Sequence, residues 1–408
     1  MVLKIDWSGD ETGLKITDLK CTVIGRNPVI RIDTDEGISG LAEVESSKYY
    51  LKPHILFYKR FILGQDPTNV ERVMLRIRRM GSFKPWGSAV SAIEMALWDI
   101  AGKAAGVPVY KLLGGKIRDK VRVYNGGIRP PMKGYSPEDY AENMRKMKNL
   151  PEKFTIIKQA IGFHGGMLAN VPDSFYGELE TGYHHPYRGH LTERGLKHVV
   201  ACVKAMKEVL GDEVGLALDC GPGWMVPSAI KLAKALEPLN VMWLEDLITG
   251  DYVPYVLPHV YREVTRSTIT PIHTGEQIYL RQNFKDLIQI HAVDIIGPDP
   301  CDIGGIAELK WVAEFADLYG ILVAPHGIGD GLIGLAALVQ MSAALPQNYI
   351  AFEYPVGRPE WWYEIVEGLP NPIVKDGFIE VWDKPGMGVE LNEKRARKYI
   401  PEGDDFFD

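Results

Sequence analysis

The sequence contains little cysteine and no long apolar run. Only four of its 408 residues are cysteine: Cys21, Cys202, Cys220 and Cys301. They form no CxxC pair and are too few for a disulfide framework, so buried thiols in a reducing compartment are expected. No stretch is long and apolar enough to span a bilayer, and the N-terminal segment carries charges where a signal peptide needs an apolar stretch. We therefore expect a cytoplasmic protein with no membrane partner.

A basic run and a dinucleotide-binding motif are also missing. The 46 Lys and Arg residues are outnumbered by 53 Asp and Glu residues, which leaves a net charge of −7. Nucleic acids and anionic membranes bind positively charged surfaces, so neither is expected as a partner. Gly126-Gly127 follows the apolar run VRVYN, but no GxGxxG motif does, which argues against a dinucleotide fold.

The first third of the chain changes from strand patterning to helical patterning. Residues 15–45 contain alternating β-branched residues and a turn signal at Asp35-Glu36-Gly37. Residues 87–105 then follow a helical period and stop at Gly106. The apolar face predicted for this helix consists of Val90, Ile93, Ala96, Leu97 and Ile100. A sheet followed by helices predicts an α+β domain over residues 1–125.

From about residue 121, short apolar runs alternate with amphipathic stretches. Eight strand candidates occur, most of them followed by a helical stretch: VRVYN, FTIIKQA, VGLALDC, VMWLED, PIHTGE, VDIIGPD, ILVAPH and YIAFEY. This repeat predicts an α/β fold with a TIM-like barrel, over residues 126–370. Residues 371–408 are expected to leave the barrel and pack on the N-terminal domain. Their last residues, EGDDFFD, are either a weakly ordered tail or an oligomer contact.

One connection in the barrel repeat is irregular. Between FTIIKQA and a helix that starts near Thr192 lie roughly 30 residues rich in Gly, Pro, Tyr and His, and loops of this length are commonly lids or substrate-binding segments. We therefore interpret this connection as a candidate lid.

Three acidic residues each close an apolar run: Asp219, Glu245 and Glu276. They are spaced about one strand-plus-helix unit apart, and a parallel barrel places successive strand ends around one mouth. Three converging carboxylates repel one another unless a cation lies between them, and a hard divalent ion with oxygen ligands fits. The spacing predicts a metal site at the barrel mouth.

The other strand ends also carry polar residues, at Lys158, Asp299, His326 and Glu353. A carboxylate on the strand before a histidine can accept its ring N–H and support the charged ring, so Asp299 and His326 form a candidate acid/base pair. Near a dication, Lys158 would have its pKa lowered, and it could act as a base or as a cation that binds a carboxylate.

Each of these residues also has a simpler interpretation. A single acid after an apolar run is more often a helix cap than a metal ligand, and a single loop histidine is usually structural. Only the coincidence at successive strand ends indicates a shared site. Gly327, Gly329 and Gly331 resemble a phosphate cradle, but no basic residue lies beside them, so turn glycines are favoured. The role of His273, inside a strand run, stays open.

Along nearly its whole length the chain resembles the enolase superfamily, in its mandelate racemase branch. Two further stretches carry the resemblance: AVSAIEMALWDIAGKAAGVPVYKLLGG, from Ala89 to Gly115, and KDGFIEVWDKPGMGVELNEK, from Lys375 to Lys394. The resemblance implies a modified (β/α)7β barrel with an α+β capping domain, built from the N-terminal region and completed by the C-terminal segment. It also implies a symmetric homo-oligomer.

For the site, the resemblance implies Mg²⁺ held by Asp219, Glu245 and Glu276. It further implies Asp299–His326 as the acid/base pair on one face of the substrate and Glu353 as a hydrogen-bonding electrophile. The shared step of the family is removal of the proton α to a carboxylate, which gives a metal-stabilised enediolate.

The chain departs from the racemase pattern at the second barrel strand. That pattern has Lys-x-Lys, whereas this chain reads Lys158-Gln159-Ala160. The sugar-acid dehydratases carry a histidine shortly after the first metal ligand, but here Asp219 is followed by Cys220-Gly221-Pro222-Gly223. The candidate lid resembles the specificity loop of those dehydratases. It supplies four candidates for the opposite face of the substrate: Tyr176, Tyr183, His184 and His185.

These observations favour the Mg²⁺-dependent dehydration of an acid sugar to a 2-keto-3-deoxy acid. One acid/base pair combined with a polar lid suits elimination of water. The alternatives are a racemase, epimerase or cycloisomerase on the same site, or a non-catalytic member of the family that binds a ligand.

Overall fold

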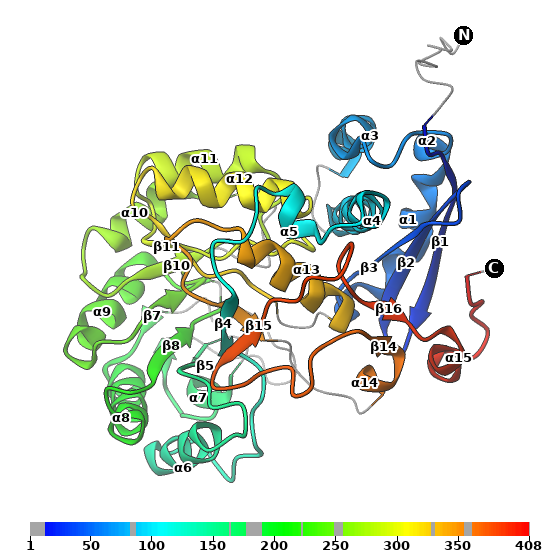
Figure 1. Cartoon of the computed structure of the whole chain (residues 1–408). Coiled ribbons are helices and arrows are strands. Elements are labelled where there is room, and N and C mark those ends of the chain that lie inside the picture. The colour runs from blue at the N-terminus through cyan, green and yellow to red at the C-terminus, as the bar shows by residue number, and fades with distance from the viewer. Residues whose placement is uncertain are drawn as a thin grey trace.

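The computed structural model contains two parts, a capping domain and a barrel (Figure 1). The described residues are 13–81, 87–162, 165–176, 190–221, 223–248, 256–327, 331–354 and 361–407. Among them, no helix combines the length and the apolar character that crossing a bilayer requires. All four cysteines are buried free thiols, as the sequence predicts.

The capping domain is built on a three-stranded antiparallel sheet in the order β1-β2-β3. Its strands are β1 (Ile16–Ile24), β2 (Asn27–Thr34) and β3 (Ser39–Glu43). The helices that follow are η1 (Ser46–Leu51), α1 (Lys52–Phe57), α2 (Lys59–Ile62), α3 (Val70–Ile77), η2 (Arg78–Gly81), α4 (Gly87–Ala105) and α5 (Val109–Leu112). The predicted sheet-then-helix order of this region is therefore present.

Helix α4 is buried on nearly all sides rather than on one face. Its residues from Gly87 to Leu97 are all buried, including Glu94, and so is Asp99. The five residues of the predicted apolar face are all buried, and the other sides are buried as well because α4 contacts both the capping strand β3 and the barrel helix α12 (Ile306–Asp317). A helix between two packed layers needs small or apolar residues all round.

The barrel contains eight parallel strands in the order β12-β11-β10-β9-β8-β5-β4-β13. Their bounds are β4 (Lys120–Asn125), β5 (Ile156–Ala160), β8 (Gly215–Asp219), β9 (Leu244–Glu245), β10 (Ile272–Thr274), β11 (Ile295–Ile296), β12 (Leu322–Val323) and β13 (Phe352–Tyr354). A parallel bridge between Val323 and Tyr349, together with a bond from Glu353 N to Pro325 O, joins the two ends of this sheet. The predicted α/β barrel with a capping domain is confirmed.

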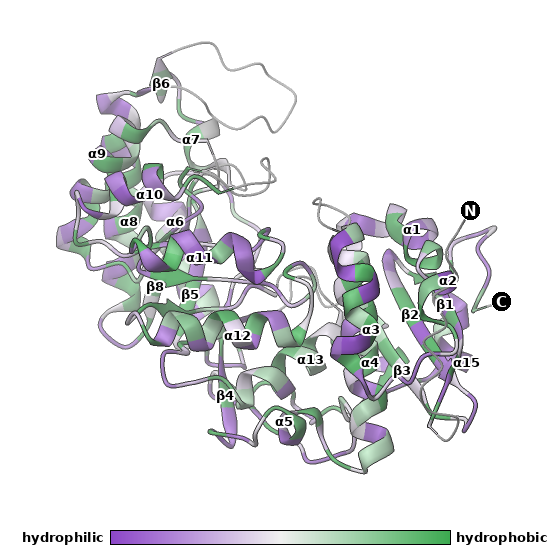
Figure 2. Ribbon diagram, turned by 90° about the horizontal axis from the view of Figure 1, so that it is seen from above, coloured by the Kyte–Doolittle hydropathy of each residue, from purple (hydrophilic) through white to green (hydrophobic). Residues whose placement is uncertain are grey.

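Helices connect and surround the barrel strands. They are α6 (Pro137–Lys148), α7 (Gly166–Ala169), α8 (Glu193–Leu210), α9 (Val226–Leu236), η3 (Glu237–Leu239), α10 (Pro258–Thr265), α11 (Arg281–Gln289), α12 and α13 (Leu332–Ala343). Helix α13 is buried along its whole length and contacts both β3 and β4, so it lies between the capping sheet and the barrel (Figure 2).

The C-terminal segment contacts both parts of the molecule. It contains α14 (Trp362–Ile365), β14 (Val366–Glu367), β15 (Phe378–Glu380), β16 (Glu390–Leu391), α15 (Glu393–Ala396) and η4 (Arg397–Tyr399). Strand β15 pairs antiparallel with the barrel strand β4, and the chain then reaches the capping domain, where Met387 N bonds to Asp99 Oδ1 at 2.7 Å.

Two aromatic residues near the end of the chain pack on their own protein, which differs from the expectation of a weakly ordered tail. Phe406 and Phe407 are 3% and 4% exposed, and their rings lie beneath the guanidinium groups of Arg397 and Arg31. Burying two aromatic rings offsets the entropy lost by ordering the tail.

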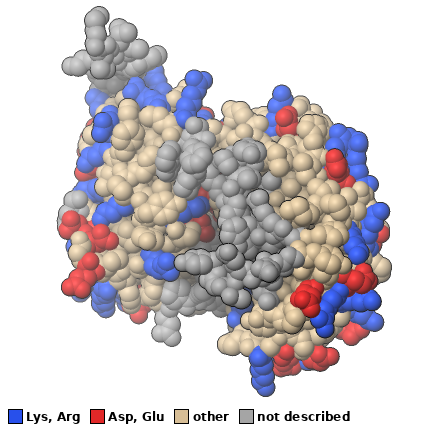
Figure 3. All heavy atoms as spheres, turned by 180° about the vertical axis from the view of Figure 1, so that it is seen from behind, with Lys and Arg blue, Asp and Glu red and all other residues tan. Residues whose placement is uncertain are grey.

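Charged side chains of both signs are intermixed on the face of the molecule shown in Figure 3. Both signs also occur in the exposed ion pairs, such as Arg145 with Glu142 and Arg194 with Asp173. A surface of this kind has no strong single-sign field.

Candidate active site

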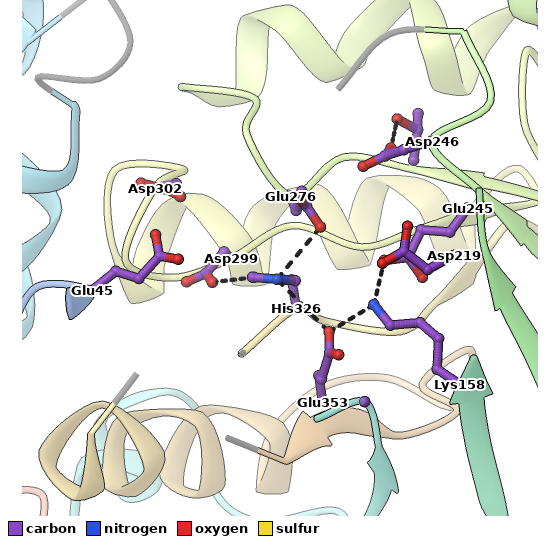
Figure 4. A network of polar contacts seen from close by, with 12 residues as sticks. Glu45, Lys158, Asp219, Glu245, Asp246, Glu276, Asp299, Asp302, His326 and Glu353 are labelled. Carbon is purple, nitrogen blue, oxygen red and sulfur yellow. Dashed lines mark hydrogen bonds and ion pairs between the residues drawn. The ribbon is translucent and has the colours of Figure 1, made fainter. Parts of the chain in front are cut away.

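Strand register brings the predicted site residues to one level of the barrel. Ala160 pairs with Asp219, Asp219 with Glu245, and Glu245 with His273 across neighbouring strands. Each of the first three residues closes its strand, so side chains far apart in sequence meet at the carboxyl ends. Figure 4 shows Lys158, Asp219, Glu245, Glu276, Asp299, His326 and Glu353 around this mouth.

Lys158 on β5 bridges two of the carboxylates. Its Nζ lies 2.5 Å from Glu245 Oε1 and 2.9 Å from Glu353 Oε2, and all three side chains are at most 2% exposed. Burial lowers the pKa of Lys158, but the carboxylates of Glu245 and Glu353 outweigh it and raise the pKa well above its ordinary value. Without a dication, the lysine is therefore held protonated, opposite to the lowering that the sequence predicted beside a metal.

Asp299 and His326 lie in direct contact on the other side of the mouth. The His326 ring donates from Nδ1 to Asp299 Oδ2 at 2.6 Å, and Asp299 Oδ1 accepts from Cys301 N at 2.7 Å. Burial lowers the pKa of His326, but the Asp299 bond and the nearby Glu353 carboxylate raise it to about 9. The other ring nitrogen, Nε2, faces Glu276 Oε2 at 3.4 Å and Glu353 Oε2 at 3.7 Å, and is thus directed into the pocket.

In protein kept free of divalent ions, this pKa predicts a pH-dependent contribution of His326 to stability. The folded-state pKa of about 9 exceeds the ordinary 6.5, so folding favours the protonated ring. The free energy of unfolding of the wild type minus that of His326→Asn is expected to be largest below pH 6.5. It should fall by roughly 3 kcal/mol as the pH rises through 9. Urea unfolding of both proteins with a chelator measures this; a pH-independent difference would contradict it.

The three predicted metal ligands do not form a closed ligand set. Glu245 is paired with Lys158 and accepts from Trp243 Nε1 at 2.9 Å, Glu276 faces His326, and Asp219 Oδ1 accepts from Gly221 N at 3.0 Å. Within the part of the chain that the structure describes, no group of three or more His, Cys, Asp or Glu side chains lies close enough to hold a metal. Like charges without a cation separate and pair with the nearest positive groups.

The chemistry of the donor set nevertheless fits a hard dication. Asp219 and Glu245 are in register on adjacent strands, and all three residues offer carboxylate oxygens, the ligands that Mg²⁺ prefers. Burial raises the pKa of Glu245, but Lys158 and His273 lower it to about 2 overall, so this ligand is anionic.

Three aromatic residues lie beneath the carboxylates: Tyr124 and Trp243, which the sequence did not single out, and His273, whose role the sequence left open. Tyr124 OH donates to Glu353 Oε2 at 3.1 Å, and Trp243 Nε1 donates to Glu245 Oε2. His273 stacks on Trp243 with ring centroids 5.4 Å apart, and its Nδ1 lies 3.6 Å from Glu245 Oε2. The alternation of side chains along the strands is the signal that could have identified these residues, since every second side chain faces the barrel interior.

Glu353 keeps one carboxylate oxygen without a hydrogen-bond partner. Its Oε2 accepts from Lys158 and Tyr124, while Oε1 is buried and has no hydrogen-bond partner among the described residues. A Cβ at Gly126 would clash with this carboxylate, so the glycine at that position makes room for it. The unpartnered oxygen is available to a substrate.

Of the four lid candidates, the structure describes only Tyr176. Tyr176 is 68% exposed on the hairpin of β6 (Phe175–Tyr176) and β7 (His190–Leu191), where it stacks on His190 with centroids 5.9 Å apart. Tyr183, His184 and His185 lie outside the described residues.

The positions that depart from the racemase and dehydratase patterns are filled by small buried residues. Ala160 and Cys220 are both 0% exposed and lie beside Asp219, in register and in sequence respectively. Ala160 has no group that can transfer a proton. Burial raises the pKa of Cys220 well above its ordinary value, so its thiol stays protonated at neutral pH.

Comparisons with known proteins agree with this architecture over the whole chain. A D-xylonate dehydratase of Haloferax volcanii is 32% identical, with 97% of this chain and 91% of that protein covered. A D-galactonate dehydratase of Variovorax paradoxus is 30% identical, with 94% and 93% covered. The crystal structure of a mandelate racemase/muconate lactonizing enzyme-like protein from Rubrobacter xylanophilus superimposes with a TM-score of 0.82 at 30% identity, covering 97% of this chain and 100% of that one.

Both parts of the chain also match protein-family descriptions. Residues 21–114 match the N-terminal domain of mandelate racemase/muconate lactonizing enzyme, and residues 141–395 match the enolase C-terminal domain-like family. The chain belongs to the mandelate racemase/muconate lactonizing enzyme branch of the enolase superfamily.

Proposed function

We propose that this protein dehydrates an acid sugar to a 2-keto-3-deoxy acid. The observation that carries the proposal is the buried Asp299–His326 pair, whose second ring nitrogen faces the same Glu353 oxygen that Lys158 contacts. An acid/base group and a cation thus lie on two sides of one carboxylate at the barrel mouth. The relatives named D-xylonate and D-galactonate dehydratase support the same class of substrate.

We assign both proton transfers to His326. Lys158 lies between the carboxylates of Glu245 and Glu353, and we assign it the role of a cation that faces the substrate carboxylate. The neutral form of His326 takes the proton from Cα, and the ring then returns this proton to the β-hydroxyl as the C–O bond breaks. The balance is the loss of one water molecule, and the enol that remains becomes the 2-keto product. Asp299 fixes the ring and stabilises its charged form.

We further propose that Asp219, Glu245 and Glu276 would hold Mg²⁺. When bound, the dication would stabilise the negative charge that develops on the substrate carboxylate. Glu353 Oε1, which has no partner, is placed to bond the same end of the substrate. The cation Lys158 and the buried donors Tyr124 and Trp243 maintain the carboxylates in position.

Incubating the purified protein with Mg²⁺ in D₂O against a panel of acid sugars tests this proposal. Loss of water to a 2-keto-3-deoxy acid, observed by NMR, is the expected result. Deuterium at Cα without loss of water would instead indicate a racemase or epimerase, and an isomer formed without loss of water would indicate a cycloisomerase. Binding without any exchange would indicate a non-catalytic ligand-binding protein.

A further inference from the structure

Three polar residues form a stripe along the first half of helix α4 in the capping domain, where the other residues are apolar or glycine. Ser88, Ser91 and Glu94 are spaced three residues apart, so they lie along one side of the helix. All three are at most 1% exposed. Buried polar groups need partners. Ser91 Oγ donates to Gly87 O and Glu94 Oε1 accepts from Trp98 Nε1 within α4, and the other partners of the stripe lie in the barrel.

The partners of this stripe are in the barrel segment that follows Asp299. Ser88 Oγ donates to Asp302 Oδ1, and Ser91 Oγ accepts from Gly304 N at 2.9 Å. The carboxylate of Glu94 accepts from the first backbone amides of α12, from Ile306 N at 2.7 Å and from Ala307 N at 2.9 Å. The capping helix therefore contacts the barrel segment at three successive points.

Glu43, at the end of β3 in the capping domain, bonds in a similar way to the barrel segment that follows His326. Its Oε1 accepts from Gly334 N, in the first turn of α13, at 2.9 Å. A Cβ at Gly331 would clash with this carboxylate, as a Cβ at Gly305 would with that of Glu94. Gly331, one of the three glycines that resembled a phosphate cradle, thus lies against a carboxyl group of the protein itself, that of Glu43.

A third contact reinforces the first. Lys48 of η1 is 5% exposed, and its Nζ lies 2.5 Å from Asp302 Oδ1 and 3.1 Å from Glu45 Oε2. The amides of Asp302 and Ile303 in turn bond to Asp299 O at 3.0 and 2.8 Å. Contacts from the capping domain therefore end one turn away from the carboxylate that orients His326 (Figure 4).

We propose that Glu94 and Glu43 are positioning residues for the acid/base pair. Each carboxylate caps the barrel helix that begins just after the segment carrying Asp299 or His326, and it thereby fixes that segment. An anion at a helix N-terminus satisfies amides that otherwise lack partners. The capping domain then builds part of the catalytic geometry in addition to covering the mouth. This role in catalysis rests on the proposed dehydratase function.

The experiment compares Glu94→Gln with Asp99→Asn, two nearly isosteric changes on the same helix. Asp99 is also a buried carboxylate that accepts two backbone bonds, from Leu41 N at 3.0 Å and Met387 N at 2.7 Å, but both partners lie within the capping domain and the C-terminal segment. Both variants should unfold at lower temperature. Only Glu94→Gln is expected to lower kcat, by roughly tenfold or more, with KM changed less than about twofold.

Amide hydrogen exchange provides a readout that does not depend on activity. In Glu94→Gln, the amides of Asp302 and Ile303 should exchange faster, because their bonds to Asp299 O report on that turn. In Asp99→Asn they should not. Ser91→Ala removes the bond from Gly304 N together with the bond that Ser91 Oγ donates to Gly87 O within α4. It should give a smaller effect in the same direction and serves if Glu94→Gln does not fold. Glu43→Gln should likewise speed exchange in the first turn of α13.

Two outcomes would overturn the proposal. One is unchanged exchange at Asp302 and Ile303 in both Glu94→Gln and Ser91→Ala. The other is a kcat in Glu94→Gln equal to that of Asp99→Asn. If the wild type converts no acid sugar, the proposed function fails, and the exchange comparison alone then decides whether the capping domain holds the Asp299 segment.

Discussion

Replacing His326 with asparagine is expected to reduce turnover by about 10³-fold or more, because the ring that transfers the proton is lost. Asparagine keeps a polar side chain of similar reach next to Asp299, which limits the disturbance of the buried site. The measurement is kcat for dehydration of the acid sugar identified by the substrate panel. Mg²⁺ titration should give the same affinity as the wild type, since His326 is not one of the proposed ligands.

Asp299→Asn serves as the partner variant for this test. Asparagine cannot stabilise the charged ring as a carboxylate does, so kcat should fall, but by less than in His326→Asn. Because the two residues act as a unit, the double variant should be no slower than His326→Asn alone. Activity retained by His326→Asn would remove the pair from the mechanism, and additive losses would mean that the two residues act separately.

Replacing Glu245 with glutamine is expected to weaken Mg²⁺ binding by about a hundredfold, because the site loses one anionic ligand. The same change removes one of the two carboxylates that pair with the buried ammonium of Lys158. Breaking a buried ion pair of this kind costs roughly 3 kcal/mol of stability. Calorimetric titration with Mg²⁺ and urea unfolding of the metal-free protein measure the two effects.

Glu308→Gln is the matched control for this experiment. Glu308 is a buried carboxylate paired with Arg281, at 2.7 Å, but it lies at α12, away from the mouth. This variant should lose stability and keep wild-type affinity for Mg²⁺. If Glu245→Gln titrates like Glu308→Gln, then Glu245 is not a metal ligand.

The site could be predicted largely because strand ends are visible in the sequence. Asp219, Glu245 and Glu353 close apolar runs, and parallel strands must place such ends at one edge of the barrel. The contact between Asp299 and His326 follows from the same rule, since they stand after neighbouring strands. The charge state of Lys158 could not be predicted, because it depends on which carboxylates the fold places within 3 Å of its nitrogen.

Residues that join the two domains were not visible in the sequence. Glu94 belongs to a helix in which the sequence showed only an apolar face, and Glu43 closes a capping strand without any motif. Their partners are backbone amides more than 200 residues away, and backbone groups leave no trace in side-chain chemistry. The packing of the tail was not visible either, because the burial of Phe406 depends on where the fold places the Arg397 side chain.

The sequence alone determined the barrel repeat and the set of polar residues at the barrel mouth, because these depend on local periodicity and on strand direction, and its motifs carried the resemblance to the family. The tertiary structure decided which charges pair, which carboxylate oxygen stays unpartnered, and that Glu43 and Glu94 cap helices of the other domain. Those features depend on distances of a few ångströms between segments remote in sequence. Only the packed fold determines such distances.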